Sequence, residues 1–201
     1  MSRDIQQMQQ ALLAANDSQG AALLSDPSTE IALYPASFLQ KYHIYRVLYH
    51  SPYKPILLYL GFAPNLPHYW LADNPQAFRD LARADQVDLV TPGVAITYAT
   101  VFLEVTRDMS VLVYLVNSVD EIQFAPKPTP EEARVADALR EKYRWIITPP
   151  SVQVIEDEYR VKVCVIRQQE LECHTLRITK TGDVQSEITI LERKMPTVIG
   201  I

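Results

Sequence analysis

The stretch that decides the fold class lies near the C-terminal end of the chain and reads EYRVKVCVIRQQELECHTLRITKTGDVQSEITILE (residues 158–192). Apolar and polar residues alternate along most of it, which is the period of a β-strand with one buried face. The expected core faces are Tyr159, Val161, Val163 and Val165, then His174, Leu176 and Ile178, then Val184, Ile188 and Ile190. Three strands of an antiparallel meander are therefore predicted, over 158–168, 171–180 and 184–192.

The helix before this meander has the clearest start signal in the chain. Thr129-Pro130-Glu131-Glu132 is a capping box with proline at the first helical position and two acids at the positive end of the helix dipole. The helix runs to Tyr143, and Pro149-Pro150 ends it. The predicted class is α+β: an antiparallel sheet with helices packed on one face, and a C-terminal helix followed by a three-stranded meander. Gly182 suits the left-handed position of a three-residue hairpin loop.

The N-terminal part predicts more helices and a hairpin. Helices are expected over 2–16, with Ser2 as cap, and over 18–24, 35–50 and 74–84, and a short buried strand over 56–62. The runs 94–106 and 111–117 are rich in Val, Ile, Thr, Tyr and Phe, so they predict a β-hairpin that is apolar on both faces. Because such a pair needs cover on both sides, a homo-oligomer such as a dimer, or a protein partner, is expected.

Residues 125–130, with three prolines at alternate positions, form the best candidate boundary. The segment is as short as an ordinary loop, so residues 1–201 are interpreted as a single α+β domain with an internal junction there.

Composition excludes several classes of protein. The 201 residues are 48% hydrophobic and 21% charged, as in a globular protein. The net charge of −5 argues against nucleic acid as a partner. The longest apolar stretch, 94–116, carries Glu104, Arg107 and Asp108, which argues against membrane insertion. Two cysteines and an N-terminus without a secretory signal indicate a cytoplasmic protein.

Common chemical signatures are absent from the sequence. The five glycines make no GxGxxG or GxxxxGK[ST] phosphate cradle, and GxSxG, HExxH and CxxC are also missing. No cofactor and no metal constellation are therefore expected.

Cys164 and His174 lie on the meander. A hairpin that turns at Gln168-Gln169 places Cys164 opposite Cys173, where the two cysteines are expected to stay as thiols. A register shifted by one step also keeps the core face intact, so both registers remain open.

His174 is expected in the core, where it would need an acid or nucleophile on an opposing element to act as a base. Charged residues are expected together on the outer face: Arg160, Lys162, Arg177, Glu158, Glu170 and Glu172.

Two groups of aromatic and imidazole residues are candidates for ligand or partner binding. Tyr42, Tyr45, Tyr49 and His50 fall along the predicted 35–50 helix, either as a pocket wall or as a face packed on a sheet. His68, Tyr69, Trp70 and Asp73 share a proline-rich loop, which either binds a ring and performs acid–base chemistry or is a packed loop with a tryptophan anchor.

These observations favour a non-catalytic binding or accessory protein that uses an apolar, tyrosine-rich pocket or surface to bind a small apolar ligand or a protein partner. The alternative is a cofactor-independent enzyme of hydrolase or isomerase type. In that case His68 or His174 would be the base and Asp73 or a tyrosine its partner.

Overall fold

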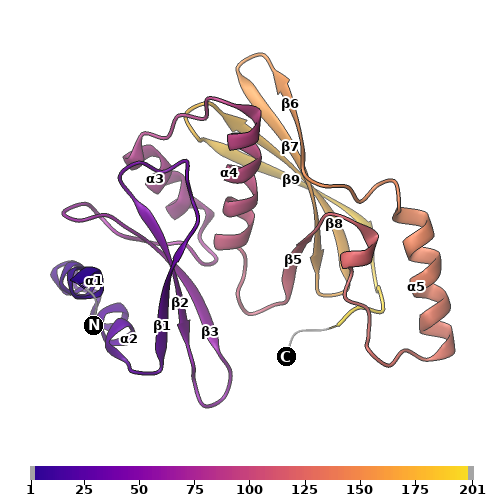
Figure 1. The fold of residues 1–201 in the computed structure, drawn as a ribbon, viewed down its shortest axis with the longest axis horizontal. Coiled ribbons are helices and arrows are strands. Elements are labelled where there is room, and N and C mark those ends of the chain that lie inside the picture. The colour runs from indigo at the N-terminus through magenta and orange to yellow at the C-terminus, as the bar shows by residue number, and fades with distance from the viewer. Residues whose placement is uncertain (1–2, 199–201) are drawn as a thin grey trace. The chain divides into compact units, whose positions relative to one another are not determined.

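The computed structural model describes residues 3–198, so the predicted cap Ser2 lies outside the described residues. The fold is α+β, with two antiparallel sheets (Figure 1). The described residues divide into two compact units, each treated separately below. The first contains residues up to Asp88 and Val101–Met109, and the second contains Leu89–Thr100 and the chain from Ser110 onward. The proline-rich segment 125–130 lies inside the second unit.

The first unit is built on a sheet of order β1-β2-β3-β4: β1 (Thr29–Tyr34), β2 (His43–Tyr49), β3 (Ile56–Phe62) and β4 (Tyr69–Trp70). Helices α1 (Arg3–Ala14) and α2 (Ser18–Ser25) pack on one face. Their shared core is Met8, Leu12, Ala21, Leu24, Val47, Leu60 and Phe62. The predicted helices 2–16 and 18–24 and the strand 56–62 are confirmed apart from their exact ends.

The other face of this sheet contacts α3 (Pro75–Asp85) and the C-terminal half of α4 (Pro92–Val105). Tyr59 and Gly61 point there, because they alternate with the inward-facing Leu60. The Tyr59 hydroxyl donates to Glu104 at 2.8 Å. Phe78 of α3 and Phe102 of α4 meet edge to face, with ring centroids 5.4 Å apart. The predicted 74–84 helix is confirmed, with Asn74 as its cap.

The predicted helix over 35–50 is wrong. Residues 43–49 form β2, which pairs with β1 on one side and β3 on the other. The tyrosines at 42, 45 and 49 match helical spacing, but Tyr45, Val47 and Tyr49 also alternate, and aromatic and β-branched residues favour a sheet. Pairing with two neighbouring strands decides between the two periods.

The predicted hairpin is also wrong in its first strand. Residues 92–105 form α4, in which Ala95, Tyr98, Phe102 and Val105 are buried. A segment that is apolar all round has no diagnostic period, so composition alone suggested a strand. The second strand is present as β5 (Val113–Val116), which pairs with β7. The oligomer was expected because the predicted hairpin was apolar on both faces, and that reason no longer holds. The oligomeric state stays a prediction.

The second unit is built on a sheet of order β5-β7-β8-β9, and β6 (Ser151–Ile155) also pairs with β7. The predicted meander is confirmed as β7 (Glu158–Arg167), β8 (Glu170–Thr179) and β9 (Val184–Glu192). Cys164 pairs with Cys173, which selects the first of the two registers, and both thiols are free and buried. Gly182 has φ 82°, as its loop position requires.

Helix α5 (Pro130–Tyr143) packs on one face of this sheet (Figure 1). Its capping box is confirmed: the Glu132 carboxylate accepts from the Thr129 backbone N–H at 2.7 Å, and the Thr129 hydroxyl accepts from the Glu132 N–H at 3.2 Å. Leu139 and Tyr143 share a core with Cys164, Ile166 and Leu171. A short 3-10 helix, η1 (Val119–Glu121), contributes Val119 to this core.

Candidate functional site

His68, Tyr69, Trp70 and Asp73 were predicted to share a loop, but Tyr69 and Trp70 form the short strand β4, which pairs with β3. The segment is fixed to α2 through one carboxylate. Trp70 Nε1 donates a 2.7 Å hydrogen bond to Oδ2 of Asp17. The other carboxylate oxygen of Asp17 accepts from the backbone N–H of Gly20 at 2.8 Å, which caps α2. One side chain therefore caps a helix and holds the loop in place.

His68 completes this cluster, with Nε2 3.9 Å from Oδ2 of Asp17. Burial alone would raise the pKa of Asp17, but the hydrogen bonds from Trp70 and Gly20 and the nearby His68 outweigh it, so the pKa lies below the ordinary 3.8. The carboxylate is ionised and its oxygens are already occupied. This geometry supports the interpretation of a packed loop with a tryptophan anchor.

Asp73 lies in a turn with φ 53°, and its backbone N–H donates to the carbonyl of Arg107 at 3.2 Å. Aspartate tolerates this left-handed conformation because its short side chain can bond locally. Asp73 is thus placed by the backbone of the loop, apart from the His68 contact with Asp17.

Tyr69 lies beside Tyr42, with ring centroids 5.7 Å apart and an interplanar angle of 57°. Tyr42 is 1% exposed and precedes β2. Burial first, then the neighbouring Tyr69, raises the pKa of Tyr42 to about 12. Tyr42 therefore stays protonated, and its buried ring packs against the half-buried ring of Tyr69.

The segment before Tyr42 is held by the buried carboxylate of Asp85, at the end of α3. Asp85 is 1% exposed and accepts hydrogen bonds from the backbone N–H groups of Gln40, Lys41 and Tyr42, at 2.7, 2.7 and 2.8 Å. A buried carboxylate needs such donors to replace water. Asp85 was not among the functional residues predicted from the sequence.

Tyr45, Tyr49 and His50 lie on or just after β2 rather than on a helix. Tyr45 and Tyr49 point to the face that α1 and α2 cover, since odd-numbered β2 residues share that face with Val47. His50 is surface-exposed, and its Nε2 lies 2.9 Å from Oε1 of Glu30. The structure thus brings Tyr42 together with Tyr69, and His68 with Trp70, whereas Tyr45, Tyr49 and His50 lie on other contacts.

A surface trough runs along α1 and the end of β3, and we call it the α1–β3 groove. Its first hollow, of about 360 Å³, has the apolar lining residues Leu33, Tyr45, Phe62 and Pro64 and the polar lining residues Asp4, Gln7, Lys41 and His43. The second, of about 370 Å³, shares Gln7, Phe62 and Pro64 with the first and extends past Gln10 and Leu66. Of the eight predicted binding residues, Tyr45 lines this groove.

The second unit contains a chain of polar side chains that crosses from β7 to β9. Nε of Arg167 lies 3.5 Å from Oε1 of Glu172, and Oε2 of Glu172 lies 2.8 Å from Nε2 of His174. Nδ1 of His174 lies 3.4 Å from Oγ of Ser186. Glu172 and His174 are each 5% exposed, which confirms the core position predicted for His174.

The placement of Glu172 on the outer face was wrong. Glu172 and His174 are two residues apart on β8, so they share a face, and the sequence pattern contained that signal. The position of Ser186 could not be predicted in this way. The register of β9 on β8 pairs Ser186 with Leu176 and Ile188 with His174, and this register brings Ser186 diagonally beside the imidazole.

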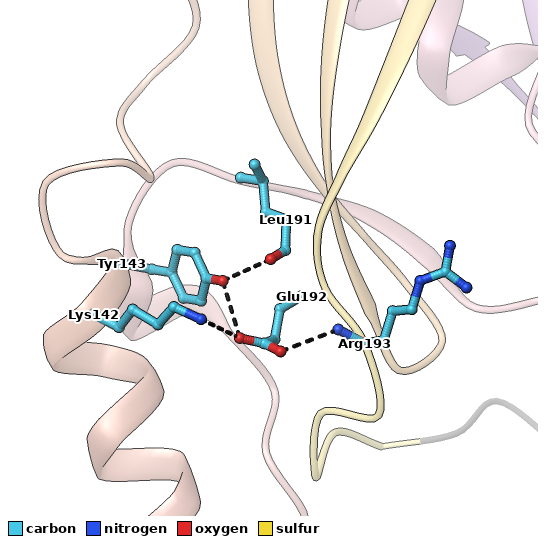
Figure 2. A network of polar contacts seen from close by, with 5 residues as sticks. All are labelled: Lys142, Tyr143, Leu191, Glu192 and Arg193. Carbon is cyan, nitrogen blue, oxygen red and sulfur yellow. Dashed lines mark hydrogen bonds and ion pairs between the residues drawn. The ribbon is translucent and has the colours of Figure 1, made fainter.

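A second polar network ties α5 to the end of β9 (Figure 2). The Tyr143 hydroxyl lies 2.7 Å from the carbonyl oxygen of Leu191 and 3.0 Å from Oε2 of Glu192. Lys142 Nζ donates to the same Glu192 oxygen at 2.7 Å. This hydrogen bond raises the pKa of Lys142 to about 12 and, from the other side, lowers the pKa of Glu192. The network pairs its charges internally and fastens a helix to a strand.

Comparison with known proteins found no match among family models, curated proteins or solved structures. Within residues 3–198, no helix is both long enough and apolar enough to cross a membrane. No three His, Cys, Asp or Glu side chains in that same range are grouped so that they could hold a metal ion.

Proposed function

We propose that the protein is a binding or accessory protein that recognises a short segment of a partner protein, without a covalent step, at the α1–β3 groove. The observation that carries the proposal is the pair of adjoining hollows, which share the apolar lining residues Phe62 and Pro64 and are also lined by polar side chains of α1. Such a mixed lining lets apolar anchors give affinity while polar groups set orientation.

The position of the groove favours an extended peptide. Leu33, which is 63% exposed, lies on β1, and β1 is an edge strand of its sheet. An edge strand presents backbone N–H and C=O groups that an added strand can pair with, while alternate side chains enter neighbouring pockets. A peptide paired with β1 would set a side chain beside Leu33, which lines the groove together with Tyr45, its partner on β2. A small apolar ligand in the same groove is the competing occupant.

The predicted loop residues support this assignment indirectly. Trp70 and His68 surround the Asp17 carboxylate, so their polar atoms serve the fold rather than a ligand. In the first unit, the proposed binding site is therefore the groove that Tyr45 lines and not the segment around Trp70. The cytoplasmic location is part of the proposal, because directly opposed free thiols at Cys164 and Cys173 persist best in a reducing compartment.

The test is selection of binders from a random peptide display library on the full chain, followed by affinity measurement with variants. Leu33→Asp places a charge in the groove and is expected to weaken the selected peptides at least ten-fold, since central apolar contacts contribute about 1–2 kcal/mol or more. Val154→Asp is the matched control, because Val154 is also an exposed strand residue, at 58%, and lies outside the groove.

Three results would overturn the proposal: no peptide selected, equal binding to Leu33→Asp and wild type, or equal weakening by Val154→Asp. Groove binding of a small apolar dye without any selected peptide would assign the groove to a small ligand instead. The enzyme alternative is favoured by one separate observation, the contact of His174 with both Glu172 and Ser186.

A further inference from the structure

The polar chain on β8 and β9 has the order carboxylate, imidazole, hydroxyl. A carboxylate accepts hydrogen bonds, so Glu172, 2.8 Å from Nε2 of His174, selects the tautomer of the imidazole that has its proton on Nε2. Nδ1 then carries the lone pair and faces Oγ of Ser186 at 3.4 Å. A nucleophile, a base and a group that orients the base are the parts of a catalytic triad, which is identified by geometry and not by order in the chain.

The three polar residues differ in burial, as a triad requires: the carboxylate and the imidazole are buried, and the hydroxyl is exposed. Glu172 and His174 are each 5% exposed, so water competes little for their hydrogen bond. Ser186 is exposed on β9, an edge strand of its sheet, where a substrate can reach it. The 3.4 Å separation is longer than an ideal O–H···N hydrogen bond, and catalytic hydrogen bonds are often long before substrate binds.

Arg167 places a positive charge beside Glu172. Its Nε lies 3.5 Å from Oε1, the carboxylate oxygen that His174 does not use. A buried carboxylate with a guanidinium on one oxygen and an imidazole on the other can stabilise the imidazolium that forms when His174 takes a proton. Glu172 is thus a positioning residue for His174.

We propose that Ser186 is a base-activated nucleophile and that the protein hydrolyses small, uncharged acyl esters at this site. The apolar side chains beside Ser186 on the same face of β9, Ile188 and Ile190, are 51% and 37% exposed and offer contact to a short acyl chain. Backbone N–H groups on the outer side of an edge strand, left unused by the ladder, are the kind of donor that an oxyanion needs. This site lies in the second unit and does not depend on peptide binding at the α1–β3 groove.

The reaction is ordinary acyl transfer. Oγ of Ser186 forms a bond to the ester carbonyl carbon while its proton passes to Nδ1 of His174. The carbon–oxygen bond to the alcohol breaks, and the departing alkoxide takes that proton. Water then attacks the acyl-serine, gives a proton to His174, and releases the carboxylic acid as the proton returns to Oγ. Water is the only co-reactant.

The experiment uses the full chain, a fluorophosphonate probe with peptide mapping by mass spectrometry, and p-nitrophenyl acetate turnover. We expect covalent labelling at Ser186 that is lost when the protein is denatured. Ser186→Ala, an exposed substitution that the fold should tolerate, is expected to lose the label and at least ten-fold of the turnover. Ser151→Ala is the matched control, because Ser151 is also an exposed serine on a strand, β6, of the same sheet.

Glu172→Gln tests the positioning role. It is expected to slow labelling of Ser186 at least ten-fold in protein that circular dichroism shows to be folded, whereas a purely structural Glu172 would lower the melting temperature and leave the labelling rate of folded protein unchanged. Labelling of another residue, no labelling of the wild type above the denatured chain, or full turnover by Ser186→Ala would each overturn the proposal.

Discussion

The indole nitrogen of Trp70 donates a 2.7 Å hydrogen bond to the Asp17 carboxylate, whose other oxygen caps α2. Two residues 53 positions apart in the sequence are therefore joined by a charge-assisted hydrogen bond. Such bonds are stronger than neutral ones, and removing either partner leaves the other with an unmet requirement. This relationship makes Trp70 a stabilising residue and leads to two predictions.

Trp70→Phe retains an aromatic ring and removes only the indole N–H and some ring area. We expect it to lower the free energy of unfolding by about 1.5–3 kcal/mol, the range for a hydrogen bond to a charged group. Chemical denaturation followed by circular dichroism measures the change. Selected peptides should still bind Trp70→Phe as they bind wild type; normal stability with lost binding would instead return Trp70 to a recognition role.

Asp17→Asn tests the pH dependence of the same contact, since asparagine also caps helices well. The pKa of Asp17 is lower in the folded protein than the ordinary 3.8, so its ionised form stabilises the fold above that pH. The stabilisation is lost as the pH falls through the folded pKa. Wild type should therefore be more stable than Asp17→Asn near pH 6, and the difference should shrink below about pH 4. A difference that stays constant from pH 6 to pH 2.5 would contradict this assignment.

Gly61 is required where β3 passes close to α3. A Cβ at position 61 would lie 2.0 Å from Cδ1 of Leu81, which is fully buried. Gly61→Ala should cost about 1–3 kcal/mol of stability, as overpacking of a filled core does. Gly93→Ala is the control, because the nearest atom to its Cβ is 4.0 Å away and alanine favours the helix that contains it.

Combining Gly61→Ala with Leu81→Ala removes the atom that the new methyl group meets. We expect Gly61→Ala to cost less in that background than in wild type, which a double-mutant cycle measures as a coupling energy. An equal cost in both backgrounds would locate the penalty in the backbone and not in the Leu81 contact.

Tyr143 and Lys142 should contribute unequally to the network of Figure 2. The Tyr143 side chain is buried, and Tyr143→Phe deprives Leu191 and Glu192 of its hydroxyl, so a loss of about 1–2 kcal/mol is expected. The Lys142 side chain is 58% exposed, and Lys142→Gln should cost less stability than Tyr143→Phe, because surface ion pairs contribute little. Urea unfolding of both variants gives the ranking, and the reverse order would contradict it.

Short-range signals predicted much of this fold. The capping box at Thr129 and Glu132 and the cap at Asn74 act within one helical turn, so the sequence alone located α5 and α3. The alternation over residues 158–192 predicted β7, β8 and β9, and the short turn at Gln168 narrowed the pairing of Cys164 to two registers. In these segments the local preference and the final environment agree, so no distant contact was needed to choose the structure.

The remaining features depend on contacts between distant residues. Tyr45 and Tyr49 suited either a helix or a strand until β1 and β3 paired with β2 on both sides. Residues 92–105, apolar in every direction, gave no periodic signal to separate a buried helix from a strand. The strand alternation already places Glu172 and His174 on the same face of β8, but Ser186 reaches His174 only through the β8–β9 register. Trp70 meets Asp17 only because the segment that contains β4 lies against the start of α2. Periodicity along the chain determines which face a residue occupies, whereas the identity of its neighbour across that face is decided by tertiary packing.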